Sequence, residues 1–381
     1  MINKKTTIVH QLTFAAIGGI QNSFIPLYKL FNQKSSFNHL IYGTHRVIPH
    51  YIEIEKNYSN FGGSLFKKLK FIYFLISKKY IVHFYNTLTS KNIYLLFKLL
   101  PVNNVIIHER GSSWNSKNSD SYIAKYLCRK SSLILANSHA SKALLVEKFN
   151  LDQNKIQVIH NGFLSKDFFI DPFNYDKKSN KFSVGFIGRL ESQKGIHILI
   201  NSAKKLPNIN FYIAGEGPML EYLEKLALGL KNVFFVGVKD PINFMCSVDI
   251  IIVPSIREPL GNVIIEAGFC KKAVIASNID GIPEIITDNI SGILLTPREP
   301  ISLNDIPLNA TPLPEFVVNP NTMKLQMPLE LNCDDLVNAI EKLRNNPLLR
   351  LDFGKSLNET VLEKFTLDKY FDNIHKIYES L

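Results

Sequence analysis

The sequence has no uninterrupted apolar run of the ~18 residues that a membrane-spanning helix needs. Its 381 residues include only 4 cysteines, none at metal-ligand spacing, so they fit isolated thiols in a reducing compartment. Signatures of zinc fingers, RNA-recognition domains and helix-turn-helix domains are also missing. These absences disfavour a membrane-spanning protein, a disulfide-framed secreted domain and the common nucleic-acid-binding modules.

The beginning of the chain resembles a signal peptide only in part. Lys4 and Lys5 precede an apolar stretch, but polar residues interrupt it, and Gly18 and Gly19 close it. The pattern favours a buried strand that enters a glycine turn, and we expect a cytoplasmic protein. The formal net charge of +11 leaves nucleic acid, an anionic membrane surface and a phosphorylated substrate open as partners.

Strand and helix patterns alternate along the chain in two successive series. Hydrophobic residues make up 46% of the chain, enough to build a core in each of two domains. The alternation predicts α/β domains with parallel sheets, and two such domains imply a ligand cleft outside the carboxyl ends of the strands. The predicted strands are 6–13, 80–85, 105–108, 133–137, 157–160, 182–187, 210–214, 233–236, 250–253 and 273–277. The predicted helices are 22–31, 64–77, 138–149, 194–205, 219–228, 263–269 and 334–343.

Composition sets the expected domain limits. The polar segment 171–181 has the character of a linker, so we predict an N-terminal domain over 1–172 and a C-terminal domain over 173–364. Residues 365–381 have an apolar helical pattern. The proline-containing segment 298–330 interrupts the second series, and its length suggests a lid, a specificity insert or a partner surface, or else a surface decoration.

The clearest chemical pattern is a pair of glutamates, Glu258 and Glu266, on either side of a glycine and a helix start. If the helix begins near Leu260, its free N–H groups can hold a diphosphate. Glu266, about two turns into that helix, could accept hydrogen bonds from ribose hydroxyls, and Glu258 would lie where an attached sugar sits. Two ordinary glutamates near a helix start are the alternative interpretation.

A second pattern is the basic pair Arg189 and Lys194, which follows the predicted strand 182–187. A guanidinium and an ammonium there suit a diphosphate, and fixed cations stabilise its negative charge as it leaves. A solvated basic loop is the alternative. Gly18 and Gly19 would let backbone approach a phosphate or sugar, or form a simple turn. His108 ends a predicted strand, at the same edge of the sheet.

Together, the order and spacing of these elements resemble the retaining glycosyltransferases of family 4, which have the GT-B fold. The resemblance covers most of the chain and is densest from residue 182 to 295. The matching stretches are 18–20, 106–108, 158–162, 186–189 with 194–195, 213–218, 235–237, 258–266 and 281–284.

The resemblance implies two Rossmann-like domains facing each other across a cleft, with the helix 365–381 crossing back to the N-terminal domain. The N-terminal domain would bind the acceptor and the C-terminal domain the nucleotide sugar. The transfer would retain anomeric configuration and use neither a cofactor nor a metal ion, with the diphosphate taking up the acceptor's proton.

The resemblance also gives each candidate residue a role. Four would act on the reacting groups: Glu258 on the sugar hydroxyls, His108 near the reactive carbon, and Arg189 and Lys194 on the diphosphate. The remaining donor-binding positions would be Gly18, Gly19, Val238 (backbone, at the base), Leu260, Gly261, Asn262 (backbone, at the diphosphate) and Glu266 (ribose).

Two positions depart from the family pattern. Asp280 stands where the family usually has the first of two glycines, so that loop would be stiffer or contact a different ligand. Pro259 follows Glu258 and lacks an N–H donor, which puts one phosphate or sugar contact in doubt.

The function expected from these patterns is transfer of a hexose-type sugar, most readily from UDP, to a lipopolysaccharide, polysaccharide or lipid-linked acceptor. A transferase acting on a soluble sugar or sugar phosphate is the alternative, followed by a non-catalytic nucleotide-sugar or nucleic-acid binding protein. The lysine- and aromatic-rich stretch 64–79 is either a core helix with solvated ends or a contact with the inner membrane surface.

Overall fold

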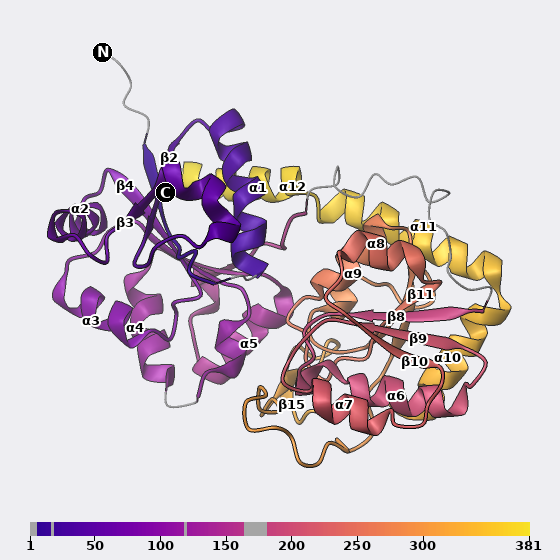
Figure 1. Cartoon of the computed structure of the whole chain (residues 1–381). Helices are drawn as coiled ribbons and strands as arrows, with labels where there is room; N and C mark the ends of the chain where they lie inside the picture. The colour runs from indigo at the N-terminus through magenta and orange to yellow at the C-terminus, as the bar shows by residue number, and fades with distance from the viewer. Residues whose placement is uncertain (1–5, 17–18, 118–119, 164–180) are drawn as a thin grey trace. The chain divides into compact units, whose positions relative to one another are not determined.

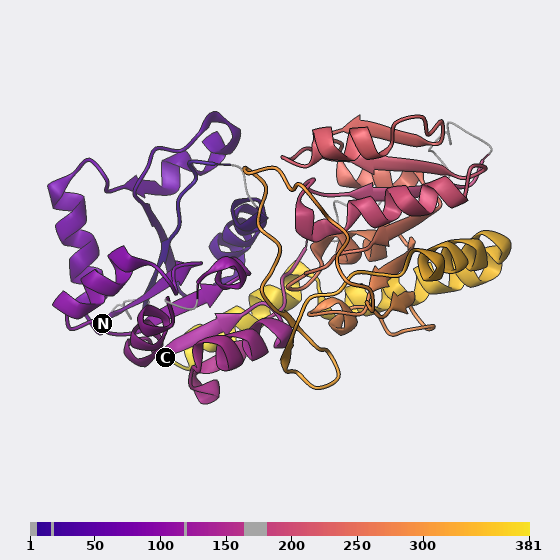
Figure 2. The ribbon, with the colours of Figure 1, turned by 90° about the horizontal axis from the view of Figure 1, so that it is seen from below.

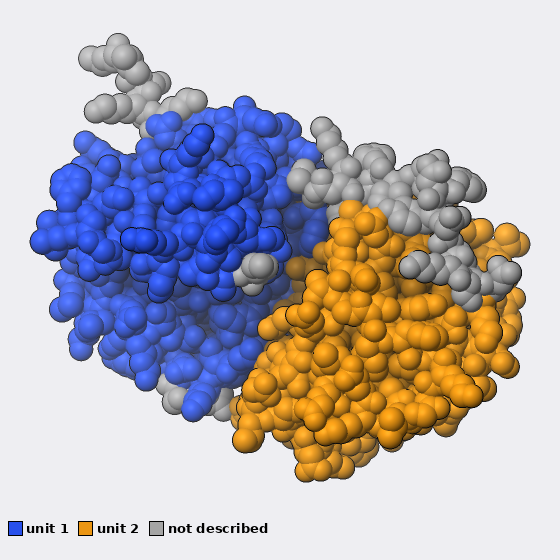
Figure 3. Space-filling view, in the orientation of Figure 1, with its two compact units in different colours: residues 1–163, 367–381 blue, residues 164–366 orange. Residues whose placement is uncertain are grey.

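A computed structural model describes residues 6–16, 19–117, 120–163 and 181–381. The chain divides into two compact units, coloured separately in Figure 3. Unit 1 consists of Met1–Phe163 and Leu367–Leu381, and unit 2 of Leu164–Thr366. The expected linker 171–181 falls almost entirely outside the described residues. No helix among the described residues is long and apolar enough to cross a membrane.

The described part of unit 1 has a seven-stranded parallel sheet of order β3-β2-β1-β4-β5-β6-β7. Its strands are β1 (Thr7–Gln11), β2 (Asn38–Gly43), β3 (Tyr58–Asn60), β4 (Tyr80–Tyr85), β5 (Val105–Glu109), β6 (Leu133–Ala136) and β7 (Ile156–Val158). Its helices are α1 (Gly19–Lys34), η1 (Pro49–Asn57), α2 (Leu65–Ile76), α3 (Lys91–Leu99), η2 (Ser112–Asn115), α4 (Ser121–Lys130), α5 (His139–Phe149), η4 (Gln153–Lys155) and α12 (Leu367–Glu379).

Unit 2 has a six-stranded parallel sheet of order β10-β9-β8-β11-β12-β13 and a small hairpin of β14 and β15. Its strands are β8 (Ser183–Ile187), β9 (Asn210–Ala214), β10 (Val233–Gly237), β11 (Ile250–Val253), β12 (Ala273–Ser277), β13 (Ile293–Leu295), β14 (Val317–Val318) and β15 (Leu325–Gln326). Its helices are η7 (Ser192–Lys194), α6 (Ile196–Lys205), α7 (Leu220–Leu226), α8 (Pro241–Ser247), α9 (Asn262–Phe269), η8 (Ile282–Glu284), α10 (Cys333–Asn345) and α11 (Pro347–Lys364).

Two parallel-sheet α/β units confirm the predicted fold class. In each sheet the strand order reverses between two neighbours, β1 and β4 in unit 1 and β8 and β11 in unit 2. Ligands of such sheets bind outside the carboxyl ends of the strands at this switch point. Figure 1 shows α6 and α7 on one side of the unit 2 sheet, and α8 and α9 on the other.

The last helix, α12, belongs to unit 1, where it packs beside α1 (Figure 1). Its buried side chains recur at helical spacing, so one apolar face covers the sheet. An ion pair of 2.7 Å between Lys34 Nζ and Asp368 Oδ1 links α1 to α12. The helix predicted over 365–381 therefore forms and returns to the N-terminal unit.

Beneath α12 the unit 1 sheet carries four buried histidines, His10, His39, His83 and His108, which we call the histidine face. His10 Nε2 lies 2.9 Å from His39 Nδ1, and His83 Nδ1 lies 2.7 Å from the Tyr378 hydroxyl on α12. Burial lowers the pKa of His10, His83 and His108 well below the usual value, and that of His39 to about 3. These imidazoles are therefore neutral in the folded unit.

The segment 298–330, called the insert below, is the long orange loop of Figure 2. It is packed onto unit 2, because Leu303 and Ala310 join the core of that unit and Val317 and Val318 are buried. It contains the β14–β15 hairpin, and its ends pair through a bridge between Glu299 and Glu330.

Candidate functional site

The candidate site of unit 2 lies at the carboxyl ends of β8 and β11, where the strand order of the sheet reverses. The loop after β8 carries Arg189 and Lys194, and the loop after β11 carries Glu258 and leads into α9. The sheet topology thus brings together the two sequence patterns that suggested donor binding.

The N-terminus of α9 is set by Gly261, whose φ of +106° is left-handed and so cannot begin a right-handed helix. The helix begins at Asn262, one residue before the predicted range 263–269 and two residues after the start near Leu260 assumed for diphosphate binding. Leu260 is buried and packs ahead of the helix. The first backbone N–H groups of a helix have no partner within it, so this terminus can hold a diphosphate.

Lys194 and Glu258 are in direct contact. The Nζ atom of Lys194 lies 2.5 Å from Glu258 Oε2, and the Ser255 hydroxyl donates to the same oxygen over 3.2 Å. Their side chains are 20% and 13% exposed, so the pair is largely shielded yet open to a ligand. A cation and a carboxylate thus stand side by side near the start of α9.

The backbone of Glu258 is held by Asp280. The Glu258 N–H donates to Asp280 Oδ2 over 2.8 Å, and the Gly281 N–H donates to the Glu258 carbonyl over 3.3 Å. Burial raises the pKa of Asp280 to about 7, against the lowering effect of two backbone N–H donors and of Arg257. The departure from the family pattern at Asp280 therefore gives Glu258 a partner.

Sequence analysis missed Arg257, which is buried immediately before Glu258. Its guanidinium donates to the Gln193 side chain, and the Ile256 N–H donates to the Gln193 carbonyl over 2.8 Å. These bonds fasten the Glu258 loop to the Lys194 loop. The only sequence signal was an arginine adjacent to the glutamate, which would equally suit an exposed loop.

Arg189 is more exposed than the Lys194–Glu258 pair, whereas Glu266 is largely shielded from solvent. The Arg189 side chain is 74% exposed, with its Nη1 atom 3.7 Å from Glu191 Oε1. Glu266 is the fifth residue of α9, about one turn in rather than the two predicted. Burial, and then the charge of Asp240, raise the pKa of Glu266 to about 7. Val238, the position expected at the base, is 66% exposed just after β10.

The structure does not bring the predicted residues of unit 1 together as a site. Gly18 lies outside the described residues, and Gly19 begins α1 with open space around the position of a Cβ atom. His108 is fully buried within the histidine face, close to His83 and Tyr370, so its role near the sugar stays a prediction.

Arg110, which sequence analysis did not name, follows β5 and is only partly buried. Its Nε atom donates to Asn161 over 3.1 Å, and its Nη1 atom to the Ser23 hydroxyl over 2.8 Å. Arg110 therefore joins three segments at the carboxyl edge of the unit 1 sheet.

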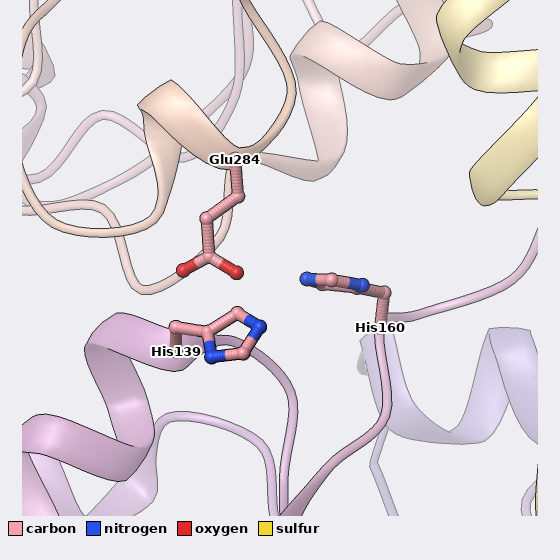
Figure 4. Close-up of side chains that lie close together, drawn as sticks. All are labelled: His139, His160 and Glu284. Atoms are coloured by element: carbon pink, nitrogen blue, oxygen red, sulfur yellow. The ribbon is translucent and has the colours of Figure 1, made fainter.

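Two further imidazoles lie at this edge of unit 1. His139 begins α5 and His160 follows β7, with ring centroids 6.0 Å apart. Figure 4 labels both rings. Glu284 belongs to η8 of unit 2. The sequence analysis included His160 and Glu284 only within matching stretches and gave neither a role.

Comparison with known proteins gives these residues a context. Residues 167–306 match the model of the family described as Glycosyl transferases group 1. An uncharacterized glycosyltransferase of Methanocaldococcus jannaschii is 27% identical over 94% of this chain and 88% of its own length. Two others from the same organism, 32% and 28% identical, are covered over only 55% and 63% of their lengths.

The fold comparison extends over the whole chain. Anabaena HepE, solved with UDP and glucose, matches with a TM-score of 0.76 and 20% identity over 99% of this chain and 100% of its own. Sucrose-phosphate synthase from Thermosynechococcus elongatus matches with a TM-score of 0.71 and 18% identity over 99% of both chains. The fold is thus the GT-B fold of these solved structures.

Proposed function

We propose that this chain, whose residues 167–306 match the group 1 glycosyltransferase family, is a retaining glycosyltransferase that works without a metal ion. It transfers a hexose-type sugar from a nucleotide diphosphate, with UDP expected, to lipopolysaccharide, another polysaccharide or a lipid-linked glycan. Solved structures of HepE with UDP and with UDP-glucose support the donor. The similarity to the capsular polysaccharide biosynthesis glycosyltransferase CapM of Staphylococcus aureus, 24% identical, supports the acceptor class.

The observation that carries this proposal is the contact between Lys194 and Glu258 near the N-terminus of α9. A nucleotide sugar presents a diphosphate next to sugar hydroxyls. The helix terminus and the ammonium suit the first, and the carboxylate suits the second.

The proposed reaction assigns a step to each of these residues. The bond between the sugar's anomeric carbon and the diphosphate oxygen breaks, and negative charge builds on the leaving diphosphate. Lys194, Arg189 and the α9 N–H groups stabilise that charge. The acceptor hydroxyl attacks from the same side, and its proton passes to the diphosphate. Glu258 holds the sugar hydroxyls and is not a nucleophile.

Separate roles for the two glutamates can be tested by calorimetry with UDP and UDP-glucose. Glu266→Gln should weaken both ligands, because ribose is common to them, whereas Glu258→Gln should weaken only the sugar-bearing one. Equal loss of free UDP in both variants would contradict the assignment. Slow release of UDP from UDP-glucose without acceptor would distinguish an enzyme from a binding protein.

The second candidate acts on a soluble sugar or sugar phosphate, as the name of sucrose-phosphate synthase states for that protein. One observation favours a lipid-linked acceptor instead. Helix α2 buries Phe71, Phe74 and Leu75, but its other side exposes apolar residues. The exposed members are Leu65 (73%), Phe66 (76%), Leu69 (57%), Tyr73 (49%) and Ile76 (38%).

Five exposed lysines accompany this apolar surface: Lys67, Lys68, Lys70, Lys78 and Lys79. An apolar stripe flanked by positive charge is typical of a helix that rests on an anionic bilayer. Each such lysine contributes roughly 1 kcal/mol near the surface. We therefore propose that the enzyme rests reversibly on the inner face of the cytoplasmic membrane, through α2 and the two lysines that follow it.

The membrane contact can be tested by co-sedimentation with vesicles of phosphatidylglycerol and phosphatidylcholine. The wild type should sediment at low salt and be released at high salt. Changing Lys67, Lys68 and Lys70 of α2 and the following Lys78 and Lys79 to Gln should abolish binding. A charge-matched control changes five exposed lysines of unit 2 to Gln and should bind normally: Lys204, Lys205, Lys225, Lys231 and Lys355. Wild type that stays in the supernatant at low salt would favour the soluble acceptor.

A further inference from the structure

The insert is fastened to the β8 loop of the candidate site and to Asp280, which holds the backbone of Glu258. On the β8 side, the Thr311 N–H donates to Glu191 Oε2 over 2.9 Å, and the Ser192 hydroxyl donates to the Thr311 carbonyl. Glu191 and Ser192 lie just before Lys194 in the β8 loop. The insert therefore packs against the loop that supplies the ammonium for the diphosphate.

On the other side, the insert meets Asp280, which follows β12. The Val318 N–H donates to Asp280 Oδ1 over 2.6 Å, and the Asp280 N–H donates to the Val318 carbonyl over 3.0 Å. The second carboxylate oxygen accepts the Glu258 N–H over 2.8 Å. The buried carboxylate of Asp280 therefore links β14 of the insert to the backbone of Glu258.

The backbone conformation of Asp280 indicates why a carboxylate occupies this position. Its φ is +46°, a left-handed conformation that glycine adopts most readily. An aspartate there is strained relative to glycine, and it is buried where a carboxylate is costly unless hydrogen-bonded. The two N–H bonds from Glu258 and Val318 offset that cost.

We propose that Asp280 is the positioning residue of the donor-sugar site, through which the insert fixes the placement of Glu258. This inference rests on the proposed role of Glu258 at the transferred sugar. The insert is then a structural part of sugar selection, and changes in β14 alter which sugar is accepted without touching the nucleotide.

Two substitutions separate this role from a general effect on folding. Asp280→Gly removes the carboxylate and fits the left-handed backbone, so the loop can keep its path. Asp280→Asn keeps only one acceptor oxygen, so one of the two N–H donors loses its partner. Glu330→Gln is the matched control: Glu330 is also a buried carboxylate of the insert, but it binds His197 and the Ser302 N–H instead.

The measurement is the affinity for UDP-glucose relative to free UDP in each variant. Loss of a buried hydrogen bond corresponds to about a tenfold change, so Asp280→Asn should lower this ratio about tenfold and Asp280→Gly at least as much. Free UDP should bind as in the wild type, and Glu330→Gln should leave the ratio unchanged. A proportional loss of both ligands, or an equal shift in Glu330→Gln, would overturn the inference.

Amide hydrogen exchange provides a readout that needs no ligand. In Asp280→Gly, exchange at Glu258 and Val318 should accelerate together, and in Glu330→Gln it should not. Unchanged protection at Glu258 would overturn the inference by itself. If the wild type binds none of a panel of UDP-, GDP- and ADP-sugars, the proposed function fails, while the exchange data still decide whether Asp280 joins the insert to Glu258.

Discussion

The two units share a strand order around their switch points but bury their polar side chains in different places. In unit 1, buried histidine rings such as His10 and His83 lie within the strands and contact the unit's own helix α12. In unit 2, Glu258 and Asp280 lie in loops that follow the strands. The mid-strand rings help to hold the fold together, whereas at the strand ends Glu258 is partly open to a ligand and Asp280 holds its backbone.

The largest expected effect is a loss of stability of unit 1, but not of unit 2, at acid pH. The folded imidazoles of the histidine face have lowered pKa values, so their stabilising contribution is complete above the unfolded value of about 6.5 and is lost as the pH falls. Each contributes a slope of up to about 1.4 kcal/mol per pH unit. Glu109, whose pKa burial raises to about 7, opposes them with a single group.

Fluorescence can isolate this response, because the single tryptophan of the chain, Trp114, is buried in unit 1. The midpoint of its thermal transition should fall steeply between pH 7 and 5. Glu266 and Asp280 in unit 2 have raised pKa values of about 7, so they stabilise that unit at acid pH and lose this contribution as the pH rises through 7. A tryptophan transition that is flat or rises on acidification would contradict the assignment.

The next largest effect concerns catalysis at the candidate site of unit 2. Lys194→Ala should lower turnover at saturating donor, since a charge-stabilising donor of this kind contributes about 2.7–4 kcal/mol to the barrier. Steady-state kinetics of donor hydrolysis or transfer measure it. Lys225→Ala removes an exposed lysine of the same unit and should leave turnover unchanged. Near-wild-type turnover in an Arg189 and Lys194 double variant would refute the role of these cations.

A smaller effect concerns the link between α12 and the sheet. Tyr378→Phe leaves His83 Nδ1 without its partner in a buried site, which costs about 1–3 kcal/mol of unfolding free energy. Tyr370→Phe is the matched control, since the Tyr370 hydroxyl is buried without a hydrogen-bond partner among the described residues. Urea titrations followed by Trp114 fluorescence compare the two. Equal destabilisation would show that ring packing, not the hydroxyl, holds α12.

Removal of divalent metal ions should have no effect on activity. If cations and helix N–H groups alone stabilise the diphosphate, EDTA should leave wild-type activity intact. Loss of activity that magnesium or manganese restores would overturn the metal-free mechanism. The same assay on the Lys194 variant would show whether an added divalent ion can replace the missing ammonium.

The sequence predicted most of the strands because short apolar runs between turn residues have few other interpretations. The ranges of β4, β9, β11 and β12 agree with the predicted ones. Helix starts were less accurate: α6 was placed at 194 but begins at Ile196, because Gly195 is left-handed with φ +66°. A single sequence does not reveal which glycine adopts that conformation.

Other elements were missed because their pattern is weak or depends on distant residues. Helix α11 buries only Phe353, Gly354, Leu357 and Val361 and is otherwise polar, so its periodicity is faint. At the site, Lys194 and Glu258 were identified, but Asp280 was seen only as a departure from a family pattern. Its partner Val318 lies 38 positions away in the chain, a pairing that no local rule predicts.

The return of α12 to unit 1 also makes unit 2 an insertion within the first unit. On the ribosome, the strands of the histidine face emerge long before the helix that covers them. At roughly 5–20 residues per second, synthesis of the intervening unit takes on the order of tens of seconds. During that interval the sheet face of unit 1 lacks the helix that covers it, so we expect unit 2 to complete its fold before unit 1 does.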